Sequence, residues 1–448
     1  MNTRIAFYLT IFTLAVFTVS CRKEWNNKIQ ENQVGTKSLN VPAGFDWSVS
    51  RDVTIEGSYL TSSTVKITSP DEKTIFYTGT GDGKPVTVNV PYIFNQVYVN
   101  GTPFNISNLK SQSGMVATKM TFPANSNRIN NSVNNHAQEF PGNESVQTFA
   151  ASFIDTDGDG VLDVDDAYPN DPLRAYNNYF PAAGFGSLAF EDLWPGIGDY
   201  DFNDLVVDYR FQVVTNAQNH VVEVMGHFAS KAAGAALNNG FGFSLPDISP
   251  DLTSNPVNLQ VSGMEINENY ISLNAQGLEN GQSEPTFIVH DNIFNLLAQP
   301  GGGTGANTTD WTASVAYDTT VLMIVPSGGN YVMADFGLTT WNPFLIVDGQ
   351  RGHEVHLPGF AATDLADPAK FATFEDDSDP LNGRTYLSHR NLPWAINLPA
   401  SFAWPKEKVD ITRAYLKFAE WAESGGSLYP DWYLNEPGYR DVNLIYNP

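Results

Sequence analysis

Residues 204–214 read DLVVDYRFQVV, a run of β-branched and aromatic residues that predicts a strand. Three runs of the same kind follow it: HVVEVMGHFAS at 220–230, FGFSLP at 241–246 and VLMIVPS at 321–327. We therefore expect residues 153–448 to form a large, mainly β domain of the sandwich or jelly-roll kind.

One helix is expected in the C-terminal part of this domain, over VDITRAYLKFAEWAESGG at 409–426. Its predicted apolar face consists of Ile411, Tyr415, Phe418 and Ala422. Asp410 can cap the start of the helix, and Gly425 suits the left-handed position after its end.

A smaller β domain is expected at 41–110. DVTIEGSYL, STVKITSP, KTIFYTGT and KPVTVNVP alternate apolar and polar residues, with turn residues between them, which predicts a small antiparallel β-sandwich. Residues 111–152 are dominated by Asn, Ser, Gln and Thr and predict a polar linker.

The N-terminus has the features of an export signal. MNTR is followed by the apolar run IAFYLTIFTLAVFTV, which is short for a membrane span and has the length of a signal-peptide core. The run ends in TVSC, and Cys21 is the only cysteine of the chain, so residues 1–20 resemble a bacterial lipoprotein signal peptide that is cleaved before a lipidated Cys21.

The residues after Cys21 suggest where such a lipoprotein would lie. No aspartate follows Cys21, so we expect a lipid anchor in the outer membrane of a Gram-negative cell envelope, followed by a flexible tether at 21–40. With one cysteine, disulfides cannot stabilise the protein.

The composition limits the classes of partner. The chain has 448 residues and a formal net charge of −25, which argues against nucleic acid and against anionic membrane surfaces as partners. The charge fits a secreted protein, a cation binder or a well-solvated surface.

The most informative motif is IDTDGDGVLDVDDAYPNDP at 154–172, with seven aspartates in nineteen residues. Its spacing matches a twelve-residue calcium loop. The predicted Ca²⁺ ligands are Asp155, Asp157, Asp159, Val161 through its carbonyl, Asp163 and Asp166, with Asp171 as a weaker candidate. Gly160 would provide the sharp turn and Leu162 the apolar anchor.

Pro169 follows too closely for the exiting helix of an EF-hand. The run instead resembles a thrombospondin type 3 repeat, whose aspartate loops are filled with calcium. The alternative is an acidic, disordered linker.

A second acidic segment, FEDLWPGIGDYDFNDLVVDYRF, covers residues 190–211. Asp199, Asp201, Asn203 and Asp204 are candidate metal ligands, and Glu191 and Asp192 can approach from the preceding turn. The alternative is that these carboxylates cap turns and accept hydrogen bonds from backbone donors.

Four separated blocks occur in an order similar to that of the LruC-type domain of bacterial envelope lipoproteins. They are AFEDLWPGIGDYDFNDLVVDYRF at 189–211, NPFLIVDGQRGHEVHLPGF at 342–360, NLPWAINLP at 391–399 and KVDITRAYLKFAEWAESGG at 408–426. The resemblance implies a secreted, largely β domain without an assigned enzymatic activity, and it carries over no catalytic residue.

Enzyme signatures are weak. His353 and His356 of HEVH are three apart in an extended segment, whereas a zinc protease needs His-Glu-x-x-His on a helix, so we interpret both as ordinary strand or turn residues. No nucleophile elbow occurs. We expect a non-enzymatic, calcium-binding surface module with a glycan or protein ligand, or with a structural role.

A carboxylate-dependent hydrolase of envelope or host polysaccharide is the alternative function. The acidic stretch FEDDSD at 374–379 is one possible carboxylate group, although a solvated loop fits it better. Candidate sugar platforms are Trp394, Trp404, Trp421 and Trp432.

Overall fold

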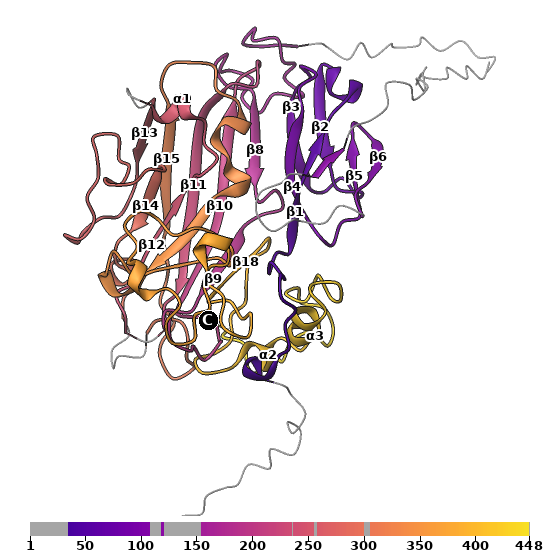
Figure 1. Cartoon of the computed structure of the whole chain (residues 1–448). Coiled ribbons are helices and arrows are strands. Elements are labelled where there is room, and N and C mark those ends of the chain that lie inside the picture. The colour runs from indigo at the N-terminus through magenta and orange to yellow at the C-terminus, as the bar shows by residue number, and fades with distance from the viewer. Residues whose placement is uncertain are drawn as a thin grey trace, which may run out of the picture. The chain divides into compact units, whose positions relative to one another are not determined.

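The computed structural model describes residues 35–107, 118–120, 154–234, 236–254, 258–299 and 305–447. The predicted signal peptide, Cys21, most of the tether and, apart from 118–120, the linker lie outside the described residues. The architecture is mainly β with several antiparallel sheets and few helices, as predicted (Figure 1).

The N-terminal domain is the expected small β-sandwich. Its strands are β1 (Ser50–Ile55), β2 (Thr64–Thr68), β3 (Ile75–Thr80), β4 (Val86–Pro91), β5 (Gln96–Val99), β6 (Thr102–Asn105) and β7 (Thr118–Met120). One sheet has the order β4-β1-β7 and the other β3-β2-β5-β6. Alternate residues such as Val53 and Ile55 of β1 point into the core between the sheets. β7 pairs in parallel with β1, so this domain includes a strand from beyond the expected boundary at 110.

The large domain is a second and larger sandwich. Its strands are β8 (Tyr176–Phe180), β9 (Gly186–Phe190), β10 (Leu205–Thr215), β11 (Val221–Ala232), β12 (Gly240–Ser244), β13 (Leu259–Ser262), β14 (Thr286–His290), β15 (Thr319–Pro326), β16 (Asn342–Ile346), β17 (Glu354–His356) and β18 (Ala395–Leu398). A seven-stranded sheet has the order β13-β15-β11-β10-β9-β18, with β8 also paired to β10, and a four-stranded sheet has the order β14-β12-β16-β17.

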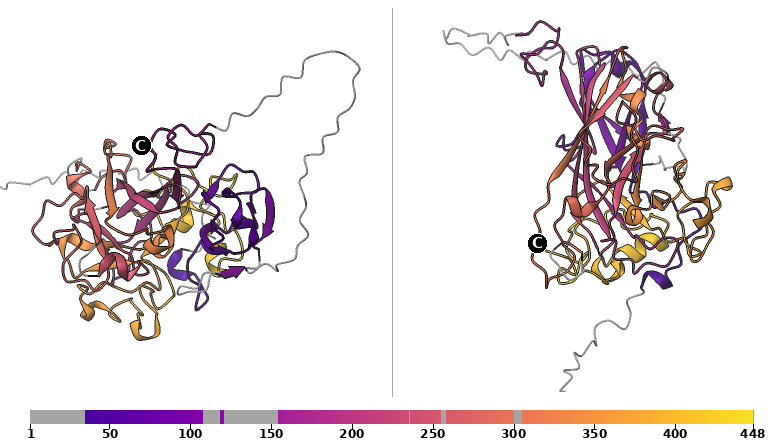
Figure 2. Two further views of the ribbon diagram at one scale, coloured as in Figure 1. Left: turned by 90° about the horizontal axis from the view of Figure 1, so that it is seen from above. Right: turned by 90° about the vertical axis from the view of Figure 1, so that its left-hand side faces the viewer.

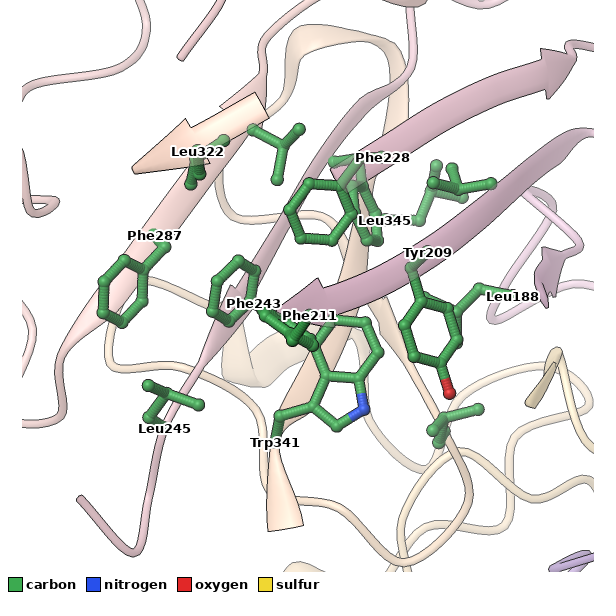
Figure 3. Packing of buried hydrophobic residues seen from close by; sticks show 14 of the residues in the cluster. Leu188, Tyr209, Phe211, Phe228, Phe243, Leu245, Phe287, Leu322, Trp341 and Leu345 are labelled. Carbon is green, nitrogen blue, oxygen red and sulfur yellow. The ribbon is translucent and has the colours of Figure 1, made fainter. Parts of the chain in front are cut away.

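The main hydrophobic core lies between these two sheets (Figure 3). Tyr209 and Phe211 of β10 and Phe228 of β11 meet Phe243 of β12 and Trp341, which precedes β16. β10 is buried on both faces near its two ends, where its sequence is mostly apolar, while Asp208, Arg210 and Gln212 alternate with buried aromatic residues in its middle.

The helices are short. They are α1 (Pro250–Thr253), α2 (Ile411–Ala414) and α3 (Phe418–Glu423). Single 3-10 turns occur at Thr36–Ser38, Ser58–Thr61, Ile293–Asn295, Met333–Phe336, Leu338–Thr340, Val347–Gly349, Pro368–Lys370 and Pro380–Asn382. The single C-terminal helix expected at 409–426 was wrong, because the chain leaves the helical path between α2 and α3, where the Leu416 N–H donates to the Tyr439 carbonyl. Asp410 does cap α2, and Gly425 has φ +60°.

Residues 35–49, here the N-terminal strap, pack against residues 402–446, here the C-terminal cap. Phe45 and Trp47 lie among Phe418 and Trp421 of α3, and Figures 1 and 2 show the yellow cap beside the indigo strap. The tether expected at 21–40 therefore ends earlier, because Leu39 is already buried in this aromatic cluster, and the strap belongs to the cap rather than to the small sandwich.

Two amide side chains connect the small sandwich to the large domain. Asn178 accepts from the Thr78 N–H at 2.8 Å and donates to the Thr78 carbonyl at 2.9 Å. Asn219 makes the same pair of bonds with Thr80, at 2.8 and 2.7 Å. Both amides thus occupy the backbone groups of β3, which is an edge strand of its sheet.

Within the described ranges, no helix has the length and apolar character needed to cross a membrane.

Candidate cation sites

The predicted calcium loop begins at Asp155 with three converging carboxylates. Asp155, Asp157 and Asp159 each offer one oxygen, and these oxygens lie within 4.8 Å of one another. Gly158 and Gly160 have φ of +80° and +98°, a backbone region that favours glycine, so Gly160 provides the turn expected at this position.

Backbone N–H groups of the loop orient these carboxylates. Gly158 and Gly160 donate to the two oxygens of Asp155 at 2.7 and 3.1 Å, and Val161 donates to Asp159 Oδ1 at 2.7 Å. The second oxygens of Asp157 and Asp159 are buried and have no hydrogen-bond partner within the described ranges. Buried oxygens without donors are the groups that a hard cation would satisfy.

Asp166 belongs to the same group of charges. Its Oδ1 accepts from the Tyr168 N–H at 2.6 Å, while its Oδ2 is buried without a partner among the residues described. Burial and the charges of Asp159, Asp157 and Asp163 raise the pKa of Asp166. Burial, together with Asp157 and Asp155, also raises the pKa of Asp159.

The structure places the remaining residues of the motif differently. Asp163 accepts two hydrogen bonds from Thr156, and Asp171 forms a salt bridge with Arg174 at 2.8 Å. Val161, expected to contribute its carbonyl, also provides the apolar anchor that was expected from Leu162, because its side chain is buried against Tyr176.

The second acidic segment forms a separate and more deeply buried cluster. Glu191 comes directly after β9, and Asp199 and Asp201 precede β10, so the pairing of these strands brings the three together. One oxygen from each lies within 4.8 Å of the others. Glu191 is 0% exposed and Asp201 1%, whereas Asp199 is half-buried.

Electrostatic repulsion in this cluster is severe. At 4.8 Å and an effective dielectric constant of 20, two carboxylates repel each other by roughly 3 kcal/mol. Burial and the charges of Asp199 and Asp204 raise the pKa of Asp201 to about 9. Burial and the charges of Asp201 and Asp199 likewise raise the pKa of Glu191 well above its ordinary value. The protein therefore favours protons or a bound cation here.

The other predicted ligands of this segment lie beside the cluster. Asp204 Oδ2 accepts from the Asp192 N–H at 2.9 Å, and Asn203 donates to the Pro405 carbonyl at 3.1 Å. Burial raises the pKa of Asp204, and the negative charges of Asp192, Glu191 and Asp199 raise it further.

Glu407 was not predicted to lie near this cluster. Burial raises the pKa of this half-buried carboxyl most, and the charge of Asp199 raises it further. The two residues are too far apart in the chain for any motif to connect them.

The residues considered for enzyme chemistry have structural surroundings. His356 lies in β17 and hydrogen-bonds Asn342 and Glu354 at 2.7 and 2.8 Å, and His353 lies in the turn before that strand and contacts the Trp194 carbonyl. The interpretation of both histidines as strand and turn residues is confirmed.

Two further expectations have structural outcomes. In the acidic stretch at 374–379, expected as a solvated loop, Asp376 is buried and accepts from the Trp194 indole N–H at 3.0 Å. The four candidate sugar-platform tryptophans, Trp394, Trp404, Trp421 and Trp432, are all buried, so they belong to the core.

A cavity of about 700 Å³ lies between the small sandwich and the large domain. Aromatic side chains in its lining include Tyr77, Tyr209 and Trp341, and carboxyl groups include Asp52 and Glu284. Burial raises the pKa of both Asp52 and Glu284.

Comparisons with known proteins found one matching family and one similar solved structure. Residues 219–433 match a family described as a domain of unknown function (DUF4842), a range that contains three of the four blocks and begins after the first. A search of curated proteins found no match.

One solved structure, described as a "Putative lipoprotein from Bacteroides ovatus", is similar with a TM-score of 0.52 and 17% identity. The similarity covers 86% of this chain and 99% of that one, so the likeness in fold extends well beyond residues 219–433.

Proposed function

We propose that this protein is a calcium-binding, lipid-anchored protein of the cell envelope whose β domains act as a non-enzymatic binding or structural module. The observation that carries the proposal is the loop at 155–166, where converging carboxylates leave buried oxygens of Asp157, Asp159 and Asp166 without donors in the described structure. Ca²⁺ takes six to eight oxygen ligands and suits such a set.

The loop lies where the large domain meets the small sandwich. Val161 packs against Tyr176, whose hydroxyl hydrogen-bonds Thr80 of β3 at 3.0 Å, and Asp165 forms a salt bridge with Lys66 of β2 at 3.0 Å. A bound Ca²⁺ ion would hold the loop in this arrangement and stiffen the junction.

The anchor is proposed from the sequence before the described residues. Cys21 ends a lipoprotein-like signal, and a protein of similar fold is described as a "Putative lipoprotein". Acyl chains at Cys21 would attach the protein to the outer membrane.

The calcium proposal is tested by thermal unfolding of the purified protein in 1 mM Ca²⁺ and in EDTA. For a dissociation constant near 10 μM, binding contributes about 2.7 kcal/mol, and each kcal/mol raises Tm by about 2–4 °C in a domain of this size. Asp157→Asn should remove the part of the shift that the loop contributes and make the chain near residues 154–172 sensitive to protease.

Asp171→Asn is the matched control, since it removes the same charge from a carboxylate that pairs with Arg174. An equal calcium shift in wild type and Asp157→Asn would contradict the proposed site.

The cavity between the two sandwiches is where a glycan or protein ligand would bind in such a module. Aromatic side chains beside hydrogen-bonding side chains are typical of ligand sites, and the lining of this cavity combines Tyr77 and Tyr179 with Asn89 and Asn397.

A second candidate function is a carboxylate-dependent hydrolase of polysaccharide, favoured by Asp52 and Glu284 in the same cavity. Release of reducing sugar from envelope polysaccharide by wild type, lost in both Asp52→Asn and Glu284→Gln, would support it. Absence of release across envelope and host polysaccharides would leave the binding or structural role.

A further inference from the structure

The positive charges near the buried cluster around Asp199, those of Lys408 and Lys37, act on Asp199 without forming a salt bridge with it in the described ranges. Within the described ranges, no lysine or arginine forms a salt bridge with Glu191, Asp199 or Asp201. Buried carboxylates are normally paired or bind metals, so protons or a cation must neutralise these three.

An independent observation points to a cation. Asn203 is 0% exposed, and its Oδ1 has no hydrogen-bond donor among the described residues, although its Nδ2 is bonded to Pro405. This oxygen lies beside the Asp204 carboxylate: a Cβ built on Gly234 would be 2.7 Å from Asn203 Oδ1 and 2.6 Å from Asp204 Oδ1. Both oxygens are good ligands for a hard cation, which would satisfy the unpaired oxygen of Asn203.

The carboxylates are also held in place before any ion arrives. Glu191 accepts from the Phe202 N–H at 2.7 Å and the Tyr200 N–H at 3.1 Å, and Asp201 Oδ2 accepts from the Lys408 N–H at 2.7 Å. A methyl group at Gly198 would overlap Glu191 Oε2, so the absence of a side chain there makes room for this carboxylate. Ligands fixed by outer hydrogen bonds are typical of metal sites.

We propose that Glu191, Asp199 and Asp201 bind a second, buried Ca²⁺ ion that fastens the C-terminal cap to the large sheet. The same loop is bonded to the cap three times, through Asp201 to Lys408, through the Tyr200 carbonyl to the Ile411 N–H at 2.8 Å, and through Asn203 to Pro405. The proposal extends the calcium role proposed above, but it concerns separate ligands and stands or falls separately from the loop.

Binding stoichiometry of Ca²⁺ in the full chain, measured by equilibrium dialysis, separates the two sites. We expect two ions per wild-type chain, one in Asp157→Asn and one in Asp201→Asn. Wild type with one ion that Asp157→Asn loses and Asp201→Asn retains would overturn the buried site alone. If wild type binds one ion that Asp157→Asn retains and Asp201→Asn loses, the loop site would be refuted and the buried site supported.

The direction of the change in Tm distinguishes the loss of a calcium ligand from a general folding defect. If the cluster binds Ca²⁺, Asp201→Asn and Glu191→Gln should lower Tm in calcium, because each removes a ligand, and raise it in EDTA, because each replaces an acid group that folding buries at a cost. An increase in Tm under both conditions would show that the cluster holds only protons and would overturn the proposal.

Trypsin provides the readout for the cap. In EDTA we expect cleavage after Lys406, Lys408 and Arg413 in wild type, suppressed at least tenfold by calcium and not suppressed in Asp201→Asn. Asp157→Asn should keep this protection. Equal protection in Asp201→Asn and wild type would contradict the fastening role.

Discussion

Gly198 lies against the carboxylate of Glu191, and its role follows from the volume that it leaves free. Its φ is not positive, so alanine suits the backbone, but the added methyl group would overlap Glu191 Oε2. Gly198→Ala should displace that carboxylate, lower the free energy of unfolding by about 1–3 kcal/mol and weaken calcium binding at the buried cluster.

Urea unfolding and calcium titration of the Gly198→Ala protein check this prediction. Gly352→Ala is the matched control, because its new methyl group meets neighbouring atoms at an ordinary 3.4 Å. Equal behaviour of the two variants would show that Glu191 moves aside without cost.

His290 makes stability depend on pH. Burial lowers its pKa from 6.5 to about 3, so below pH 6.5 the unfolded chain binds a proton that the folded chain does not. The free energy of unfolding should therefore fall with decreasing pH, by about 1.4 kcal/mol from this residue between pH 7.5 and 5.5.

Unfolding of wild type and His290→Gln at both pH values, in saturating calcium, isolates the contribution. Other histidines with lowered pKa, among them His227, His353 and His356, remain in both proteins and cancel. Parallel pH profiles would contradict the prediction.

At this scale, the sequence predicts a site only when its residues are close in the chain. Asp155, Asp157 and Asp159 follow from spacing, because a tight loop has few ways to direct alternate side chains inward. The approach of Glu191 to Asp201 depends on how β9 pairs with β10, and that of Glu407 on how the cap folds back, so neither could be read with certainty from a motif.

At the scale of elements, α2 depends on a single aspartate. Asp410 Oδ1 accepts from the Thr412 N–H at 3.0 Å, and Oδ2 accepts from the N–H and hydroxyl of Thr36 at 3.0 and 2.6 Å. Asp410→Ala should lower the free energy of unfolding by about 1–2 kcal/mol through loss of the cap and of the contact with the strap.

A double-mutant cycle with Thr36→Val measures the second part in chemical unfolding. The two changes should cost less together than the sum of the single changes, because they remove shared hydrogen bonds. If the two changes in the free energy of unfolding are strictly additive, the contact between Thr36 and Asp410 does not stabilise the strap.

Strands were predictable because their sequence pattern is also their packing pattern, as in β1 and β10. The helix at 409–426 was predicted from a correct apolar face, since Ile411, Tyr415, Phe418 and Ala422 are all buried. Its interruption was not predictable, because it depends on a hydrogen bond from Leu416 to Tyr439, more than twenty residues further along the chain.

At the scale of the whole molecule, Asn178 and Asn219 cover the edge of a sheet of the small sandwich. Their amides replace the neighbouring strand that β3 lacks, and unpaired edge strands promote aggregation. Asn219→Ala should cost about 1–3 kcal/mol and increase aggregation on heating, because it leaves the Thr80 N–H and carbonyl unpaired.

Thermal unfolding followed by light scattering tests this prediction. Asn280→Ala is the control, because that exposed amide bonds the Ser272 side chain and should change stability by less than about 0.5 kcal/mol. Matching curves for the two variants would remove the edge-protecting role.

Attachment to the envelope is tested on the intact chain in its cell. Cys21→Ser should move the protein from the membrane fraction to the soluble fraction and abolish labelling with palmitate, because acyl chains provide the proposed anchor. Unchanged membrane association would contradict the lipid anchor.

The contact between strap and cap has a mechanical consequence. Any tension that arrives along the chain from Cys21 reaches Thr36, Phe45 and Trp47 before it reaches the first strand of the small sandwich. Because these residues pack against Asp410, Phe418 and Trp421, the force is transmitted to the C-terminal cap. Neither sandwich is unfolded strand by strand until the contact between strap and cap breaks.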